Sequence, residues 1–154
     1  MRVLKFGGTS VGSAKSISKV LDILAEYSKE GIPFTSVFSA VGGVTNKLIE
    51  MSNVAATGDE SYKAALTDFE NKHYEIVRQL IPASDQSTVF ADIKRLVNDL
   101  DDQLTGVSLI KELSPKTLDF ILSHGERLNV RVLTKIAQLK GLDVEYLDTR
   151  TVIK

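Results

Sequence analysis

The stretch that decides the fold is Val3-Leu4-Lys5-Phe6-Gly7-Gly8-Thr9-Ser10. A short, mostly apolar run that meets two glycines at once predicts a buried strand ending in a tight turn. Ser13 is then the predicted N-cap of a helix that ends at Gly31. Within that helix, apolar residues recur at helical spacing: Ile17, Val20, Leu21 and Leu24.

A second strand is predicted over residues 34–40, FTSVFSA, and it is followed by another glycine pair, Gly42-Gly43. A helix over about residues 45–56 comes next. A strand, a helix and a strand joined by a short return form a βαβ unit, so we predict that the two strands are parallel. Both glycine turns then lie at the carboxyl edge of the sheet, where open α/β sheets bind ligands.

The rest of the chain is predicted to be mostly helical. Apolar stripes within about residues 59–105 indicate an antiparallel helical hairpin whose second helix ends at Gly106. Pro115 begins another long helix, with a break expected near Gly125. Residues 142–147 are predicted as a third strand. Three strands give these helices little sheet to cover, so we expect a truncated α/β domain with a parallel sheet.

Composition narrows the classes of function. The 154 residues are 43% hydrophobic and 25% charged, as in an ordinary globular domain, and the net charge of -1 gives no reason to expect nucleic acid as a partner. There is no cysteine for disulfides or thiolate metal sites. No signal peptide or membrane span is evident, so a cytoplasmic protein without a membrane partner is expected. Neither His73 nor His124 has the partners of a metal site, and His73 is predicted at the edge of the core.

Lys5 and the glycines after it form a candidate phosphate site. Two glycines let backbone amides turn toward a ligand without Cβ interference, and the following helix points its N-terminus at the same place. The motif is not a Walker A loop, because that motif has its lysine after the glycines. A glycine pair alone is more often just a tight connection, but a lysine inside an apolar strand favours the ligand interpretation.

The second glycine turn is flanked by hydroxyl groups. Ser39 precedes it and Thr45 follows it, so both can face the crevice between the two turns. Thr45 or Asn46 can equally serve only as the cap of the following helix. Both interpretations stay open on spacing alone.

Glu126 is the third candidate. It follows Leu118 and Leu122 at intervals of four, which predicts a carboxylate on an apolar stripe, with no cation three or four residues away. An unpaired buried carboxylate is costly, so it needs either a ligand ammonium or an Arg or Lys from another element. Gly125 beside it costs about 1 kcal/mol against Ala in a helix, and we expect it to mark a close approach of another segment.

Three segments carry a family resemblance. Residues 5–11, KFGGTSV, resemble the opening motif of aspartokinases, within the amino-acid kinase fold. Residues 38–46 resemble the second motif of that family, on the substrate side, and residues 123–127, SHGER, resemble the third. The motifs occur in the family's order across essentially the whole chain. The resemblance implies a three-layer α/β/α fold with a mainly parallel sheet, truncated after about half the domain. The hairpin and residues 106–115 resemble the form fused to homoserine dehydrogenase, and the lysine-sensitive single-function form stays open as an alternative.

The resemblance implies roles for particular residues. Contacts to the ATP phosphates are implied for Lys5, Phe6, Gly7, Gly8, Thr9 and Ser10, with Lys5 also catalytic because it neutralises charge on the transferred group. Binding of L-aspartate is implied for Ser39, Thr45 and Glu126, the last taking the α-ammonium. Mg²⁺ would be held mainly by phosphates, with no metal ligand from the chain. NADP would be used only if the parent carries a homoserine dehydrogenase domain.

The implied activity is transfer of the ATP γ-phosphoryl group to the side-chain carboxylate of L-aspartate. This transfer is the first step toward lysine, threonine and methionine, and its product is 4-aspartyl phosphate. The family's later Arg/Ser/Asp motif and adenine-binding segment do not occur in this sequence, so we expect the chain alone to be inactive. An unfinished sheet leaves a bare strand edge and an exposed apolar face, so we also expect a homo-oligomer. Two alternatives stay open: another amino-acid kinase, and a non-catalytic ligand-binding or dimerisation module.

Overall fold

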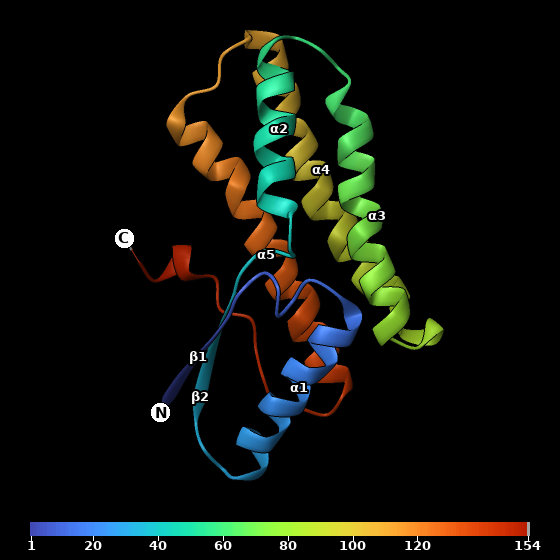
Figure 1. Cartoon of the computed structure of the whole chain (residues 1–154), viewed down its shortest axis with the longest axis vertical. Coiled ribbons are helices and arrows are strands. Elements are labelled where there is room, and N and C mark those ends of the chain that lie inside the picture. The colour runs from blue at the N-terminus through green and yellow to red at the C-terminus, as the bar shows by residue number, and fades with distance from the viewer. Residues whose placement is uncertain (154) are drawn as a thin grey trace.

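The structure is a computed structural model that describes residues 1–153 (Figure 1). The strands and α-helices are β1 (Arg2–Phe6), α1 (Ala14–Lys29), β2 (Phe34–Phe38), α2 (Val44–Ala56), α3 (Tyr62–Leu80), α4 (Gln86–Ile110) and α5 (Pro115–Leu139). Figure 1 shows the carboxyl ends of both strands pointing toward a bundle of α2, α3, α4 and α5, with α1 beside the sheet. None of the helices in the described part of the chain has the length and apolar character needed to cross a membrane.

The sheet is parallel, as predicted. β1 pairs with β2 in a register that sets Lys5 beside Val37 and Phe6 beside Phe38. Side chains alternate between the two faces, because successive residues of a strand point in opposite directions. Phe6 and Phe38 stack on the face turned to the core, with ring centroids 5.3 Å apart. The other face is open, and Val3 there is 66% exposed. The α/β class and the predicted βαβ unit are confirmed.

The predicted third strand is wrong. Residues 142–147 form no strand, and the sheet of the described residues contains only β1 and β2. A strand needs a neighbour for its backbone groups, and here a side chain replaces one, since Gln138 Nε2 donates to the carbonyl of Val144 at 2.9 Å. Leu142 stays close to the end of α5, with its N–H bonded to the carbonyl of Ala137.

Two predicted interruptions of helices are also wrong. α4 passes through Gly106 and ends only at Ile110, where Lys111 adopts a left-handed conformation with φ 54°. The apolar stripe explains this extension, because Val107 is buried and the packing beyond Gly106 outweighs the ~1 kcal/mol cost of a glycine in a helix. α5 runs without a break through Gly125.

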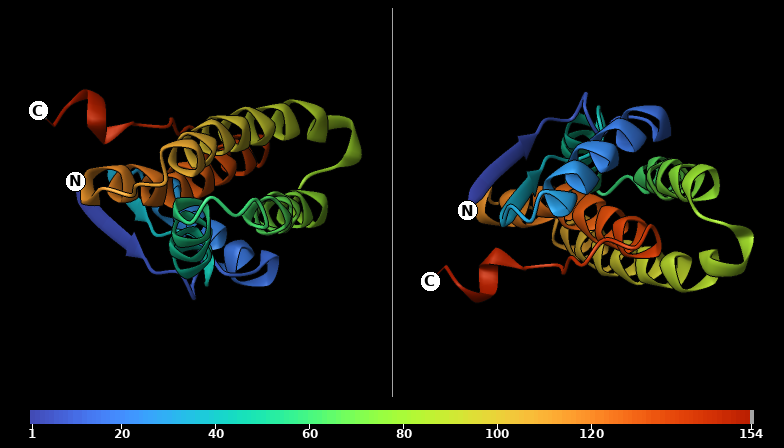
Figure 2. Two further views of the ribbon diagram at one scale, coloured as in Figure 1. Left: turned by 90° about the horizontal axis from the view of Figure 1, so that it is seen from above. Right: turned by 90° about the horizontal axis from the view of Figure 1, so that it is seen from below.

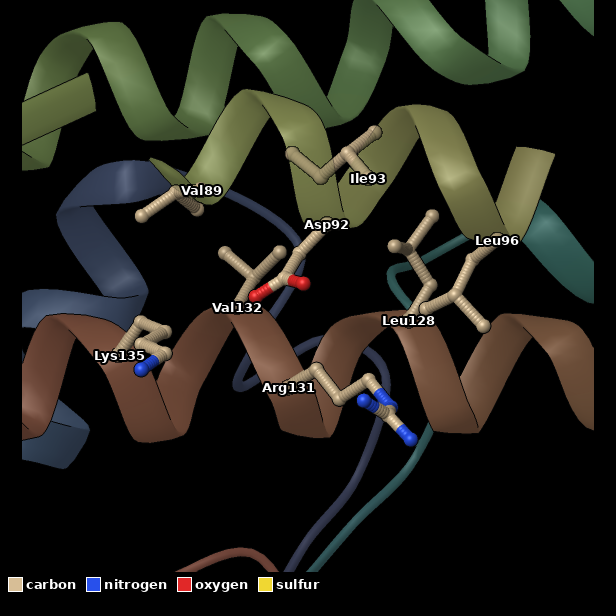
Figure 3. Close-up of a pocket in the computed structure, with 8 residues that line it drawn as sticks. All are labelled: Val89, Asp92, Ile93, Leu96, Leu128, Arg131, Val132 and Lys135. Carbon is tan, nitrogen blue, oxygen red and sulfur yellow. The ribbon is translucent and has the colours of Figure 1, made fainter. Parts of the chain in front are cut away.

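The helices of the bundle pack through apolar side chains. Figure 2 shows α4 and α5 running side by side, and the contact is seen closely in Figure 3. There Val89, Ile93 and Leu96 of α4 face Leu128 and Val132 of α5, around a depression too tight to admit water. This close packing makes the bundle a firm base for the turns at the ends of the strands.

Gly125 is a point where α5 packs closely against the segment after β2. A Cβ atom at this position would lie 2.9 Å from Ala40 Cβ, 3.1 Å from Val44 Cγ1 and 3.3 Å from Leu48 Cδ1. Distances below 3.0 Å require a shift of the neighbouring atoms. The predicted close approach at Gly125 is therefore confirmed.

We expect Gly125→Ala to destabilise the chain. Alanine favours a helix by ~1 kcal/mol over glycine, but crowding of a packed core typically costs ~1–3 kcal/mol and here exceeds that gain. Gly106→Ala is the matched control, because a Cβ there meets nothing within 4 Å. Urea denaturation of residues 1–154 should show a lower free energy of unfolding for the first variant and an equal or higher one for the second. Equal stabilities of Gly125→Ala and wild type would contradict the close approach.

His73 lies fully inside the core rather than at its edge. It is 1% exposed, and its Nδ1 is bonded to the carbonyl of Phe69 at 2.8 Å, whereas its Nε2 is buried without a partner in the described part of the chain. The pKa of His73 is lowered to about 4, chiefly by burial; the bond to Phe69 opposes this shift, and the charge of Lys72 contributes to it. The ring is neutral at pH 7.

This pKa predicts a loss of stability in mild acid. The unfolded chain takes up a proton at His73 below about pH 6.5, and the folded chain does so only near pH 4. The free energy of unfolding should therefore fall between these values, by up to roughly 3 kcal/mol from this residue, and level off below them. Denaturation of wild type and His73→Phe over this range should give a shallower dependence for the variant. Identical slopes would show that His73 does not titrate in this way.

Candidate functional site

The two glycine turns meet backbone to backbone at the carboxyl edge of the sheet. A Cβ at Gly8 would lie 3.2 Å from the carbonyl oxygen of Ala40, and one at Gly42 would lie 3.3 Å from the carbonyl oxygen of Gly8. Gly12 is equally tight, because its Cβ would be 3.0 Å from that same Gly8 oxygen. The predicted juxtaposition of the turns is thus present, and it depends on the absence of side chains.

Lys5 lies beside this junction on the open face of the sheet. It is the last residue but one of β1, it is exposed, and its ammonium makes no ion pair or hydrogen bond within residues 1–153. Gly7 is exposed with open space around it, and Thr9 is exposed as well. Phe6 points to the opposite face, so only its backbone can contact a ligand bound near Lys5.

The N-terminus of α1 is capped by its own serines. Ser13 Oγ accepts from the N–H of Ser16 at 3.2 Å, and Ser16 Oγ accepts from the N–H of Ser13 at 3.1 Å. These two amides, which could have met an anion, are therefore occupied. An anion near Lys5 would rely mainly on the amides of the turn before Ser13.

The second glycine turn is held from three sides. The N–H of Ser39 donates to the carbonyl of Phe6 at 3.0 Å, and the carbonyl of Ser39 accepts from Asn129 Nδ2 at 2.6 Å. On the other side, Lys72 Nζ donates to the carbonyl of Gly42 at 2.7 Å. Asn129 and Lys72 were not among the residues predicted from the sequence. A buried amide on an apolar helix face is a signal that could have drawn attention to Asn129, but Lys72 carries no local signal.

Thr45 does not cap α2. The N-cap is Gly43, in a left-handed conformation with φ 82° and no side-chain hydrogen bond. The interpretation of Thr45 or Asn46 as a mere cap is therefore wrong. Thr45 is exposed in the first turn of α2, and its hydroxyl has no partner among residues 1–153. The hydroxyl is available to a ligand.

Glu126 lies at the edge of the apolar stripe rather than on it. The core-facing line of α5 passes through Ile121, Gly125 and Leu128, and Glu126 is half-buried next to it. Since Gly125 touches Ala40 and the start of α2, Glu126 lies near the second glycine turn. No cation pairs with its carboxylate within residues 1–153, so the structural ion pair considered from the sequence is not formed there.

His124 sits beside Glu126 but belongs to the core. It is 1% exposed, and its Nδ1 lies 3.2 Å from the carbonyls of both Phe120 and Ile121. Burial lowers the pKa of His124, and the charge of Arg127 adds to this effect. The ring therefore supports α5 as a neutral group.

The described residues contain no group of three or more His, Asp or Glu side chains suited to a metal ion. An open groove of about 710 Å³ lies elsewhere, between the end of α4 and the start of α5. Its lining includes Ile110, Phe120 and Arg150 and none of the residues predicted to bind phosphate or substrate. The candidate site is thus the junction of the two turns and not this groove.

Comparison with known proteins agrees with this architecture. Residues 1–154 match the family described as "Amino acid kinase family". The chain belongs to this family. A chloroplastic bifunctional aspartokinase/homoserine dehydrogenase 2 of Arabidopsis thaliana is 28% identical over 151 residues, which are 98% of this chain and 16% of that protein. An aspartokinase of Chlamydia pneumoniae is 30% identical over 153 residues, 98% of this chain and 30% of that protein.

Solved structures of amino acid kinase family members match as well. E. coli aspartokinase III in complex with aspartate and ADP superimposes with a TM-score of 0.83 at 25% identity. The same enzyme in complex with lysine and aspartate gives a TM-score of 0.84. Each match covers 99% of this chain and 32% of that chain. The chain therefore spans between about a sixth and a third of the length of these relatives.

Proposed function

We propose that this chain is the N-terminal part of the catalytic domain of an aspartate kinase, residues 1–154 with the helical hairpin formed by α3 and α4. The enzyme would transfer the γ-phosphoryl group of ATP to the side-chain carboxylate of L-aspartate and give 4-aspartyl phosphate, toward lysine, threonine and methionine. The observation that carries the proposal is the contact of the two glycine turns, with Lys5 just before the first turn and Glu126 next to Gly125, which packs against the second. Similarity to aspartokinases over nearly the whole chain supports it.

The two turns would bind different reactants. The phosphates would meet the backbone of Phe6, Gly7, Gly8 and Thr9, the hydroxyls of Thr9 and Ser10, and the ammonium of Lys5. The N–H of Ser10 already donates to the carbonyl of Gly7 at 2.9 Å. A lysine there is a point charge that offsets negative charge on the transferred group.

L-Aspartate would lie at the second turn. Its α-ammonium would pair with Glu126, and its carboxylates would meet the hydroxyls of Ser39 and Thr45. The side-chain carboxylate then attacks the γ-phosphorus, the bond to the β,γ-bridging oxygen breaks, and ADP leaves. Catalysis of this kind comes from positioning and charge stabilisation, without a covalent enzyme intermediate.

Mg²⁺ would supply charge neutralisation at the phosphates. Since residues 1–153 present no carboxylate cluster for it, we propose that the phosphates hold it mainly themselves. NADP enters only if the full protein also carries a homoserine dehydrogenase, as the bifunctional relatives do by name. A homo-oligomer and a cytoplasmic location remain predictions from the sequence, and several plant relatives are named chloroplastic.

Lys5→Ala in the full-length protein should lower kcat far more than it raises the KM for aspartate. The reason is that the ammonium acts on charge that develops only in the transition state, where such an interaction is worth ~3 kcal/mol, or roughly a hundredfold in rate. The measurement is aspartate-dependent ADP release in a coupled assay, with Lys29→Ala at the far end of α1 as control. Near-normal turnover of Lys5→Ala would remove Lys5 from the mechanism.

Glu126→Gln in the full-length protein should raise the KM for aspartate. Loss of a charge-assisted bond to the α-ammonium costs ~1.5–3 kcal/mol, which is about ten- to a hundredfold, while the KM for ATP should barely move. The control is Glu112→Gln in the exposed loop between α4 and α5, which should behave as wild type. An unchanged KM together with a lower Tm would assign Glu126 a structural role instead.

A further inference from the structure

The carbonyl of Gly42 is anchored by a residue from a distant helix. Lys72 lies on α3, 30 residues further along the chain, and its Nζ donates to this carbonyl at 2.7 Å. Gly43, the N-cap of α2, is next to the contact, because a Cβ on it would lie 4.0 Å from Lys72 Nζ. The ammonium forms no salt bridge within residues 1–153, so this backbone oxygen is its bonding partner there.

The base of Lys72 is rigid even though its side chain is exposed. His73 is 1% exposed and Phe69 is 2% exposed, and both fix the same stretch of α3 in the core. Their rings lie 4.7 Å apart. A second link between α2 and α3, from Lys47 Nζ to Asp68 Oδ2 at 3.6 Å, lies one turn before Lys72 on α3. A side chain on such a base can hold a turn in place.

The anchored turn is also the one that touches the first glycine turn. Ala40 and Val41 are buried, so the turn is fixed on its inner side by packing and on its outer side by Lys72. Gly42 in turn lies close to the first turn, since a Cβ on it would be 3.3 Å from the carbonyl oxygen of Gly8, and a Cβ on Gly8 would be 3.6 Å from the Cα of Gly42. A shift of Gly42 would therefore change the separation of the two turns.

We propose that Lys72 is a positioning residue for phosphoryl transfer, which acts through Gly42 to fix the first and second glycine turns relative to one another. The proposal rests on the function proposed above, in which one turn binds the phosphates and the other the acceptor. Lys72 touches neither reactant. Its role is to hold the separation across which the carboxylate attacks the γ-phosphorus, and in-line attack depends steeply on that separation.

The first test does not depend on the function. Hydrogen–deuterium exchange of residues 39–46 is measured in the full-length wild type, in Lys72→Met and in Lys47→Met, which loses the same charge from the neighbouring link. Exchange should be severalfold faster in Lys72→Met and unchanged in Lys47→Met. Equal exchange in Lys72→Met and wild type would overturn the anchor, whatever the protein catalyses.

The second test is kinetic. In the full-length protein, Lys72→Met should lower kcat about tenfold, with both KM values changed less than threefold, because slack at the junction misaligns two bound reactants. Lys72→Arg should restore most of kcat, since a guanidinium can also donate to the carbonyl of Gly42. The Tm of both variants should equal that of wild type. Unchanged kcat in Lys72→Met, or an equal loss in Lys47→Met, would overturn the positioning role. Absence of aspartate-dependent ADP release from wild type would overturn the proposed function and leave the exchange result standing.

Discussion

The structure depends on one steric constraint, which is that backbone must touch backbone where the two strands end. Gly8, Gly12 and Gly42 approach so closely that a Cβ on any of them would lie 3.0–3.3 Å from a carbonyl oxygen. Gly125 of α5 packs against the segment after β2, where a Cβ would lie 2.9–3.3 Å from side-chain atoms. Without these glycines the two turns and α5 would be forced apart, and the crevice between them would lose its shape.

The helical bundle holds the second glycine turn in place. α5 bonds the carbonyl of Ser39 through Asn129, and α3 bonds that of Gly42 through Lys72. Both helices are fixed by large buried residues, among them Leu128 on α5 and Phe69 on α3. The second turn thus takes its position from elements that are stiff and distant in sequence, whereas the first turn takes its position mainly from β1 and from the serine cap of α1.

Local sequence signals were enough to predict the elements whose ends are determined by residues nearby in the chain. The glycine pairs, the Ser13 cap and the apolar stripes gave the βαβ unit and the long helices, because each depends on neighbours a few residues away. Residues 142–147 were mistaken for a strand because a strand also needs a partner, which no local pattern supplies. Lys72 escaped prediction for a related reason, since its partner is 30 residues away and its surroundings on α3 look like an ordinary solvated face.

The open face of the sheet carries both exposed apolar side chains and the charge of Lys5. Lys5 is flanked there by Val3, 66% exposed, and Val37, 47% exposed. A charge among exposed valines is still surrounded by water, which weakens its attraction for an anion. Anything that covers these valines also removes water from the ammonium, so burial of apolar area and strengthening of the Lys5 charge occur in the same step. The lysine within the apolar strand is therefore best understood as a group whose electrostatic effect is set by what covers the sheet.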